Sequence, residues 1–252
     1  MIKYKAIISD CDGTLIQNGR NGFPSSRVKA SITSAQAHVH VGVATSRNLS
    51  LITPIANELN LRGPSVVHGG ALIYDFSTST SYYQYPLPHE SLKKIYEITA
   101  TLGYALVVDT NEKHFTMDRN TSLSRSIFGA YTINLTENDA TALKTTVEST
   151  VDIEVFLLPA WNPGKFDVGF SAKKATKQHG VNHVAEILGI TPSEIIGVGD
   201  GQNDLPLLMG CGLKIAMGNA VPELKSIADY IAPSVEDDGI VDIIEKFILQ
   251  TV

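Results

Sequence analysis

Short apolar runs alternate with helical stretches at both ends of the chain, and this alternation constrains the fold more than any other feature. Apolar runs lie at Tyr4–Ser9, His40–Ala44 and Ser65–His68, and helical patterns lie between them at Ser26–Ala37 and Ser50–Leu59. Strand–helix–strand repeats of this kind predict a parallel sheet with right-handed crossovers.

The same alternation returns near the carboxyl end of the chain. A helical stretch at Ala172–Leu188 precedes an apolar strand at Glu194–Val198, and further strands are predicted at Leu213–Ala216 and Tyr230–Ala232. A closing helix fits Gly239–Leu249. We therefore expect the two ends of the chain to build one sheet together.

The middle of the chain follows a different pattern. Residues 71–85 are typical of a β-hairpin, and mixed helix and strand patterns follow until Pro159, Pro163 and Gly164 interrupt them. Those patterns are helices at 90–102 and 137–149 and strands at 104–109, 113–117 and 153–158. We interpret residues 85–165 as an inserted α+β domain, and residues 1–84 with 166–252 as a discontinuous core. The predicted fold class is α/β, with a Rossmann-like parallel sheet in the core.

Composition excludes several classes of partner. The net charge of −6 argues against a basic face for nucleic acid. No stretch approaches the ~20 apolar residues that span a bilayer, and the first residues lack the layout of a signal peptide. Two distant cysteines, Cys11 and Cys211, fit a reduced protein. We expect a cytoplasmic protein, a monomer or weak homodimer, that binds a small molecule rather than a membrane or nucleic acid.

Two carboxylates follow the first predicted strand. Asp10 and Asp12 lie directly after the apolar run, and Gly13 lets the chain turn behind them. Ligands of open parallel sheets bind just beyond the carboxyl ends of the strands, so acids at this position favour chemistry over packing. A simple turn is the alternative, because Asp and Gly are common after strands.

Three further segments could meet these acids at the same sheet edge. Thr45-Ser46-Arg47 follows the second strand and could bind an oxyanion, although the segment taken alone favours a helix N-cap. Lys173, Lys174 and Lys177 precede a predicted helix, and the residues alone do not choose among them. The loop after the strand 194–198 carries two acids, Asp200 and Asp204, and the amide of Asn203.

A cluster of four aspartates requires a cation or bound protons. If Asp10, Asp12, Asp200 and Asp204 converge, each close pair repels by about 4 kcal/mol at an effective dielectric of 20. All these ligands are oxygens, which suits a hard cation, Mg²⁺ before Ca²⁺ or Zn²⁺. Acids, a hydroxyl, a lysine and Mg²⁺ together favour phosphoryl transfer, in which one carboxylate attacks phosphorus and the other handles the leaving-group proton.

The chain resembles the haloacid dehalogenase (HAD) superfamily of phosphohydrolases over nearly its whole length. Asp10-Cys11-Asp12-Gly13-Thr14-Leu15 is similar to the first motif of that family, Thr45 to the second, and Gly199-Asp200 with Asn203-Asp204 to the fourth. The closing stretch is similar to the Cof-type subfamily, IIB, at Met217-Gly218-Asn219-Ala220, Lys225, Ala228-Asp229 and Asp238-Gly239. The resemblance implies that the insert is a cap domain of the C2 type, which selects the substrate.

The resemblance also implies a role for each candidate. Asp10 is expected to be the nucleophile that forms an aspartyl-phosphate, and Asp12 the general acid and then base. The spacing before Gly189 in Cof-type members selects Lys177 as the third-motif lysine, which with Thr45 and Ser46 holds the phosphoryl group. Mg²⁺ is expected on Asp10, the backbone carbonyl of Asp12 and Asp200. Asp204 then supports the metal as an outer ligand, and Asn203 orients phosphate or the lysine.

Two departures from the family pattern concern the substrate. The chain has Thr45-Ser46-Arg47 where the family has Thr-Gly-Arg, and His68-Gly69-Gly70-Ala71 where the family tends to have Asn-Gly-Ala. Arg47 could contact substrate or pair with an acid. His68 could contact substrate or serve as a structural hydrogen bonder. In the insert, further candidate contacts are His114, Arg119, Arg125, Trp161 and Lys165, for which surface or packing roles are the alternative.

These observations predict a Mg²⁺-dependent phosphatase. Its substrates are expected to be small phosphorylated metabolites, such as sugar phosphates or phosphoglycolate-like monoesters, hydrolysed through an aspartyl-phosphate intermediate. One alternative is a phosphomutase of the phosphomannomutase type on the same scaffold. Another is a non-catalytic phosphoacceptor module that resembles a response-regulator receiver, although a receiver needs its acceptor aspartate after a later strand.

Overall fold

The chain folds into two compact units in the computed structural model, which describes residues 3–17, 22–121, 125–160 and 162–251. The core unit comprises Met1–Arg47, Leu51–Gln84 and Thr176–Val252, and the cap unit comprises Asn48–Ser50 and Tyr85–Ala175. One boundary lies between Gln84 and Tyr85. The second lies after Ala175 rather than at residue 165, because β10 (Phe166–Ser171) pairs with β8 (Gly129–Leu135) and β9 (Glu154–Pro159) of the cap unit. Trp161 lies outside the described residues.

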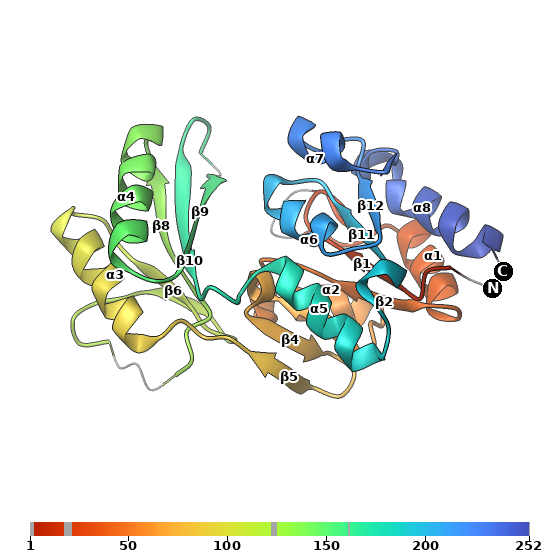
Figure 1. Ribbon diagram of the computed structural model, residues 1–252, viewed down its shortest axis with the longest axis horizontal. Helices are drawn as coiled ribbons and strands as arrows, with labels where there is room; N and C mark the ends of the chain where they lie inside the picture. Colours follow the sequence, from red (N-terminus) through yellow and green to blue (C-terminus); the bar gives the residue numbers. More distant parts are fainter. Residues whose placement is uncertain (1–2, 18–21, 122–124, 161, 252) are drawn as a thin grey trace. The chain divides into compact units, whose positions relative to one another are not determined.

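A parallel sheet organises the core unit (Figure 1). Its five strands run in the order β13-β12-β11-β1-β2, and every pairing between neighbours is parallel. The strands are β1 (Ala6–Ser9), β2 (His40–Val43), β11 (Ile195–Gly199), β12 (Leu213–Ala216) and β13 (Tyr230–Ile231). Most residues of β1, β2, β11 and β12 are buried, as parallel strands covered on both faces require, whereas the edge strand β13 is partly exposed. The predicted fold class is confirmed. The strand β1 joins the two halves of the core, because it lies between β2 and β11 and pairs with both.

Helices of the core unit begin and end where their sequences provide terminal hydrogen bonds. They are α1 (Ser26–Gln36), α2 (Leu49–Glu58), α5 (Lys177–Leu188), α6 (Leu205–Met209), α7 (Pro222–Ile227) and α8 (Gly239–Phe247). The predicted helix from Ala172 starts only at Lys177, because the Thr176 hydroxyl accepts the backbone N–H of His179 as an N-cap. Gly189 ends α5 with a left-handed φ of 65°. Among the described residues, none of the helices has the length and apolar character to cross a bilayer.

Five short 3₁₀ helices complete the connections of the core unit: η1 (His68–Gly70), η2 (Pro192–Glu194), η3 (Gln202–Asp204), η4 (Val235–Asp237) and η5 (Leu249–Thr251). Among these, η1 follows β3 directly, and η3 follows β11 after the two residues Asp200 and Gly201. They therefore place short polar segments next to the strand ends at which a ligand would bind.

The third predicted strand departs from the expected parallel sheet. The strand β3 (Pro64–Val67) pairs antiparallel with β4 (Leu72–Asp75), which pairs with β5 (Thr80–Gln84) in a separate three-stranded sheet. An isolated parallel bridge between Ala44 and Val66 links β3 to the end of β2. The chain reverses directly after β3 because His68, Gly69 and Gly70 all have positive φ. The first strand of the predicted hairpin, β4, therefore pairs with β3, and β3 belongs to the sheet of the hairpin rather than to the parallel sheet.

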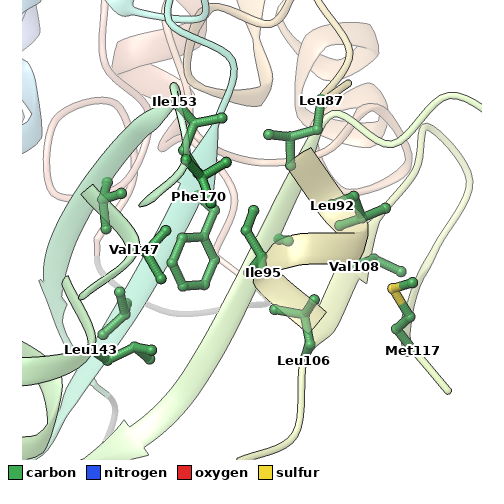
Figure 2. Packing of buried hydrophobic residues seen from close by; sticks show 14 of the residues in the cluster. Leu87, Leu92, Ile95, Leu106, Val108, Met117, Leu143, Val147, Ile153 and Phe170 are labelled. Carbon is green, nitrogen blue, oxygen red and sulfur yellow. The ribbon is translucent and has the colours of Figure 1, made fainter. Parts of the chain in front are cut away.

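The cap unit contains an antiparallel sheet with two helices. Its five strands run in the order β7-β6-β8-β10-β9. The remaining bounds are β6 (Val107–Asp109), β7 (His114–Thr116), α3 (His89–Thr101) and α4 (Glu137–Thr150). Figure 2 shows the apolar side chains of α3 and α4, among them Ile95 and Val147, packed against Phe170 of β10.

Candidate active site

The two aspartates that follow β1 have different surroundings. The Asp10 side chain is buried at 6% exposure, and its backbone N–H continues the sheet by donating to the carbonyl of Val198 at 2.8 Å. The Asp12 side chain is 36% exposed. Directly after Asp12 the chain turns at Gly13, whose φ is +80°. A Cβ at Gly13 would lie 2.2 Å from Asp200 Oδ2, so only glycine permits this close approach.

Lys177 connects Asp10 with the loop after β11. Its Nζ donates to Asp10 Oδ1 at 2.5 Å and to Asp204 Oδ1 at 2.6 Å, and the Lys177 side chain is only 3% exposed. Burial alone would lower the pKa of Lys177, but the charges of Asp10 and Asp204 outweigh it and raise that pKa. The pKa of Asp10 lies well above its usual range, first because of burial and then because of Asp204. A lysine that stays charged here compensates the buried acids.

Asp204 and Asp200 occupy the glycine-flanked loop. Asp204 Oδ2 accepts the backbone N–H groups of Asp200 at 3.1 Å and Gly201 at 3.0 Å, while its Oδ1 accepts Lys177. Both oxygens of Asp204 therefore already have strong donors. Asp200 Oδ1 accepts the hydroxyl of Thr14 at 3.1 Å. Burial, and then Asp204, raise the pKa of Asp200 to about 6.

Arg47 holds Asp12 by a two-pronged ion pair. Arg47 Nε donates to Asp12 Oδ2 at 2.8 Å, and Nη2 donates to Oδ1 at 2.6 Å. The hydrogen bond to Asp12 raises the pKa of the Arg47 guanidinium. The fork geometry fixes the plane of the Asp12 carboxylate as well as its position. Of the alternatives that the sequence left open for Arg47, the pairing with an acid is the one observed.

The segment around Thr45 is tied to the turn after β3. Thr45 is buried, and its Oγ1 accepts the backbone N–H of Arg47 at 3.1 Å. The backbone N–H groups of His68 and Gly69 donate to the carbonyls of Arg47 and Thr45 at 3.1 and 2.8 Å. His68 is itself buried, with φ at +51°. Ser46, half-buried, has its Oγ 3.8 Å from the position of a Cβ on Gly69.

The remaining candidates from the sequence lie elsewhere. Lys173 pairs with Asp152 within the cap unit and Lys174 is exposed, so Lys177 alone of the three lysines reaches the aspartates. Asn203 is exposed on the loop beside Asp204. In the cap unit, Arg125 pairs with Glu112. The side chains of His114 and Arg119 are exposed and that of Lys165 is half-buried.

The structure adds two residues that sequence reasoning gave no role. Thr14 belongs to the first motif, and its hydroxyl reaches Asp200 across nearly the whole length of the chain. Asn219 donates from Nδ2 to the carbonyl of Gly13 at 2.9 Å, and the same Nδ2 lies 3.4 Å from Asp200 Oδ2. Its place in Met217-Gly218-Asn219-Ala220 was a signal, because that stretch was part of the resemblance to Cof-type proteins.

A family model agrees with this geometry. The model of the haloacid dehalogenase-like hydrolases matches residues 7–128 and 110–244 of the chain. The chain belongs to this family. It is a Cof-type member of the HAD superfamily and an enzyme of the phosphoric monoester hydrolase class.

Relatives of this HAD hydrolase match it from end to end. It is 26% identical to a putative phosphatase of Streptococcus pyogenes over 98% of this chain and 100% of the relative. It is also 26% identical to a phosphoglycolate phosphatase of Methanopyrus kandleri, with 96% of each chain covered. A solved sugar phosphatase of HAD subclass IIB has the same fold, with a TM-score of 0.78, 21% identity, and coverage of 96% of this chain and 98% of that one.

The acids of this HAD hydrolase fit a divalent metal ion. Asp10, Asp200 and Asp204 each offer a carboxylate oxygen, and these oxygens lie within 4.8 Å of one another. An oxygen-only set suits Mg²⁺. Asp204 is already saturated by Lys177 and two backbone N–H groups, so Asp10 and Asp200 are the side chains best able to ligate the ion.

Proposed function

We propose that this HAD hydrolase is a Mg²⁺-dependent phosphatase that cleaves small phosphorylated metabolites through an aspartyl-phosphate on Asp10. The observation that supports this proposal most strongly is the position of the buried Asp10 carboxylate. Its Oδ1 accepts from Lys177, and it lies close enough to Asp200 for one cation to bind both side chains. Lys177 fixes one oxygen of the nucleophile and supplies positive charge beside it. The other oxygen is then directed at phosphorus.

The two carboxylates after β1 divide the reaction between them. In the first half, an oxygen of Asp10 forms a bond to phosphorus while the bond from phosphorus to the ester oxygen breaks, and Asp12 gives its proton to the leaving oxygen. In the second half, Asp12 takes a proton from water as the water oxygen attacks phosphorus. The acyl phosphate then cleaves, which releases inorganic phosphate and restores Asp10. Both oxygens of Asp12 accept from Arg47 in this structure, so in the proposed cycle one of them leaves Arg47 to carry the proton, while the other keeps Asp12 oriented.

The phosphoryl oxygens need positive partners. Lys177 provides one, and the hydroxyls of Thr45 and Ser46, with Asn203 on the facing loop, are the proposed polar contacts. Asp10, the backbone carbonyl of Asp12 and Asp200 would hold Mg²⁺, with Asp204 as an outer support. When bound, the ion offsets the negative charge of the phosphoryl group and of the clustered acids.

The proposed substrates are sugar phosphates or phosphoglycolate-like monoesters. A relative named phosphoglycolate phosphatase and a structural neighbour named sugar phosphatase support this class. We propose that the cap unit, centred on residues 85–165, supplies the selectivity, with His68 as a further substrate contact from the core unit. We also propose that the enzyme acts on free metabolites in the cytoplasm, as a monomer or weak homodimer.

A phosphate-release assay tests the proposal. The full chain is incubated with p-nitrophenyl phosphate and a panel of sugar phosphates and phosphoglycolate, in Mg²⁺ and in EDTA. We expect release of inorganic phosphate in Mg²⁺ only, and its loss in Asp10→Asn by a factor on the order of 10⁴ or more, with the circular dichroism spectrum unchanged. Mass spectrometry after acid quench should find the acyl phosphate on the peptide that contains Asp10.

Two results would contradict the proposal. Turnover by Asp10→Asn at the wild-type rate would place the nucleophile elsewhere. Isomerised sugar phosphate with little free phosphate, dependent on a bisphosphate activator, would identify a phosphomutase instead.

A further inference from the structure

The loop between β12 and α7 is hydrogen-bonded to the backbone of Gly199 and Asp200. The N–H of Met217 donates to the carbonyl of Gly199 at 3.0 Å, and the N–H of Val221 donates to the carbonyl of Asp200 at 2.9 Å. The loop itself is anchored from α7, because Lys225 Nζ donates to the carbonyl of Gly218 at 2.6 Å. Residues 217–221 thus form a fixed support beside the glycine-flanked loop.

Asn219 is the residue of this support that turns toward the acids. Its Oδ1 accepts the backbone N–H of Val235 at 2.9 Å, and its Nδ2 donates to the carbonyl of Gly13 at 2.9 Å. The same Nδ2 lies 3.4 Å from Asp200 Oδ2. The N–H of Val235 can only donate, so the amide oxygen must face it and the NH₂ group must face Gly13 and Asp200. One amide therefore links three segments that are distant in sequence.

These contacts leave the Asp200 carboxylate held from two sides. Thr14 donates to Oδ1 at 3.1 Å, and Asn219 approaches Oδ2. The Gly13 turn is part of the same arrangement, since Gly13 packs directly on the Asp200 carboxylate. Outer partners of this kind set the orientation of a metal-ligating carboxylate, and their loss typically costs 10–100-fold in metal affinity or activity.

We propose that Asn219 is a positioning residue for the metal site: its amide fixes the orientation of the Asp200 carboxylate and of the Gly13 turn, and thereby sets the affinity for Mg²⁺. This inference rests on the proposed function, in which Asp200 ligates the ion. The competing role is a structural brace between loops. A brace would act on the stability of the metal-free protein, whereas a positioning residue acts on the affinity for the ion.

Isothermal titration of the metal-free full chain with MgCl₂ separates the two roles. We expect Asn219→Ala to raise the Kd for Mg²⁺ about 10-fold or more. Activity should recover most of its kcat when Mg²⁺ is raised to saturation. The matched control is Gln36→Ala, because the Gln36 amide also donates to two backbone carbonyls of the core unit, those of Leu59 and Asn60, away from the acids. Gln36→Ala should leave the Kd unchanged, and both variants should lower the metal-free Tm by similar small amounts.

The outcomes distinguish this inference from the proposed metal site. A Kd in Asn219→Ala equal to that of the wild type, or a metal-free Tm far below that of Gln36→Ala with the affinity preserved, overturns the positioning role alone, provided that Asp200→Asn no longer binds the ion. If the wild type does not bind Mg²⁺, or if Asp200→Asn binds it as the wild type does, then the proposed metal site fails and Asn219 has no ligand to position.

Discussion

In the core unit, charged side chains are buried at the carboxyl edge of the parallel sheet, whereas in the cap unit the buried cluster is almost wholly aliphatic and aromatic. Lys177 and Asp204 are 3% and 0% exposed, and Phe170 of the cap unit is also 0% exposed. The same degree of burial changes the free energy of folding in opposite directions in the two units. Apolar burial contributes about 25 cal/mol per Å², while a buried charge costs free energy unless a partner compensates it.

The comparison shows which region can tolerate change. The Asp10–Lys177–Asp204 group depends on three side chains from β1, α5 and η3, each placed to within hydrogen-bonding distance. The cap cluster shares its packing among many residues, with Phe170, Ile95 and Val147 near its centre (Figure 2). A substitution in the first group should affect chemistry and stability together, whereas one in the second should affect stability first.

The largest expected effect comes from Lys177→Met. It removes the cation and leaves Asp10 and Asp204 as buried carboxylates without that partner. Breaking a buried ion pair by removing one member typically costs about 3–5 kcal/mol of unfolding free energy. The loss of positive charge beside phosphorus should lower kcat by about 10²–10³-fold as well. Urea unfolding and phosphate release measure the two effects.

A double variant tests the cause of that loss. Asp10→Asn in the Lys177→Met background removes one of the uncompensated carboxylates, so it should restore much of the unfolding free energy but none of the activity. Stability costs that simply add, without recovery in the double variant, would show that Lys177 does not stabilise the site by compensating Asp10.

Phe170→Ala should produce a comparable loss of stability in the other region. Removing a fully buried Phe side chain typically costs about 3–5 kcal/mol through lost burial and the cavity left behind. Hydrogen exchange followed by mass spectrometry should place the lost protection within residues 85–175. Ile133→Ala is the control, because Ile133 is 49% exposed on a strand of the same unit and should cost about 0.5 kcal/mol or less. Equal loss of protection in the core strands would show that the two units unfold as one.

The two regions also differ in how far their sequences predict them. The strands of the core are apolar runs in the sequence and can be predicted from it. The acids that follow β1 and β11 lie at the ends of these strands, so a parallel sheet alone predicts that they meet at one edge. In the cap unit, β8 and β10 were not predicted. Both strands contain glycine, and β10 follows the Pro163-Gly164 break. Their pairing depends on neighbouring strands, and β-propensity depends on such context.

Within the site, contacts between distant segments were the part that the sequence could not supply. The three lysines before α5 look alike as residues, and the Thr176 N-cap decides that Lys177 begins the helix. The pair Asp10 and Asp12 could be predicted as a site from the sequence. The hydrogen bond from Arg47 to Asp12, however, joins residues that follow two different strands, and no local sequence pattern indicates it. Asn219 is the extreme case, because its role follows from hydrogen bonds to Gly13 and Val235.

The smallest expected effect is a pH dependence confined to the core unit. Burial and Asp204 raise the pKa of Asp200 from 3.8 to about 6, so in the metal-free protein the folded state binds a proton more tightly than the unfolded chain. The resulting stabilisation is complete below about pH 4 and is lost as pH rises through about 6. Buried Asp10, whose pKa is also raised, adds to the trend.

Because Mg²⁺ requires the carboxylates without their protons, the Tm increase that it causes should grow over the same interval. Tm measured from pH 5 to 8 in EDTA and in Mg²⁺ checks both slopes, with Asp200→Asn as the control in which both should flatten. Among the described residues, the apolar cluster of the cap unit holds no carboxylate or histidine, so Phe170→Ala should lower the Tm equally from pH 5 to 8. A wild-type Tm in EDTA that falls from pH 5 to 7 no more steeply than that of Asp200→Asn would contradict the assignment of the proton to Asp200.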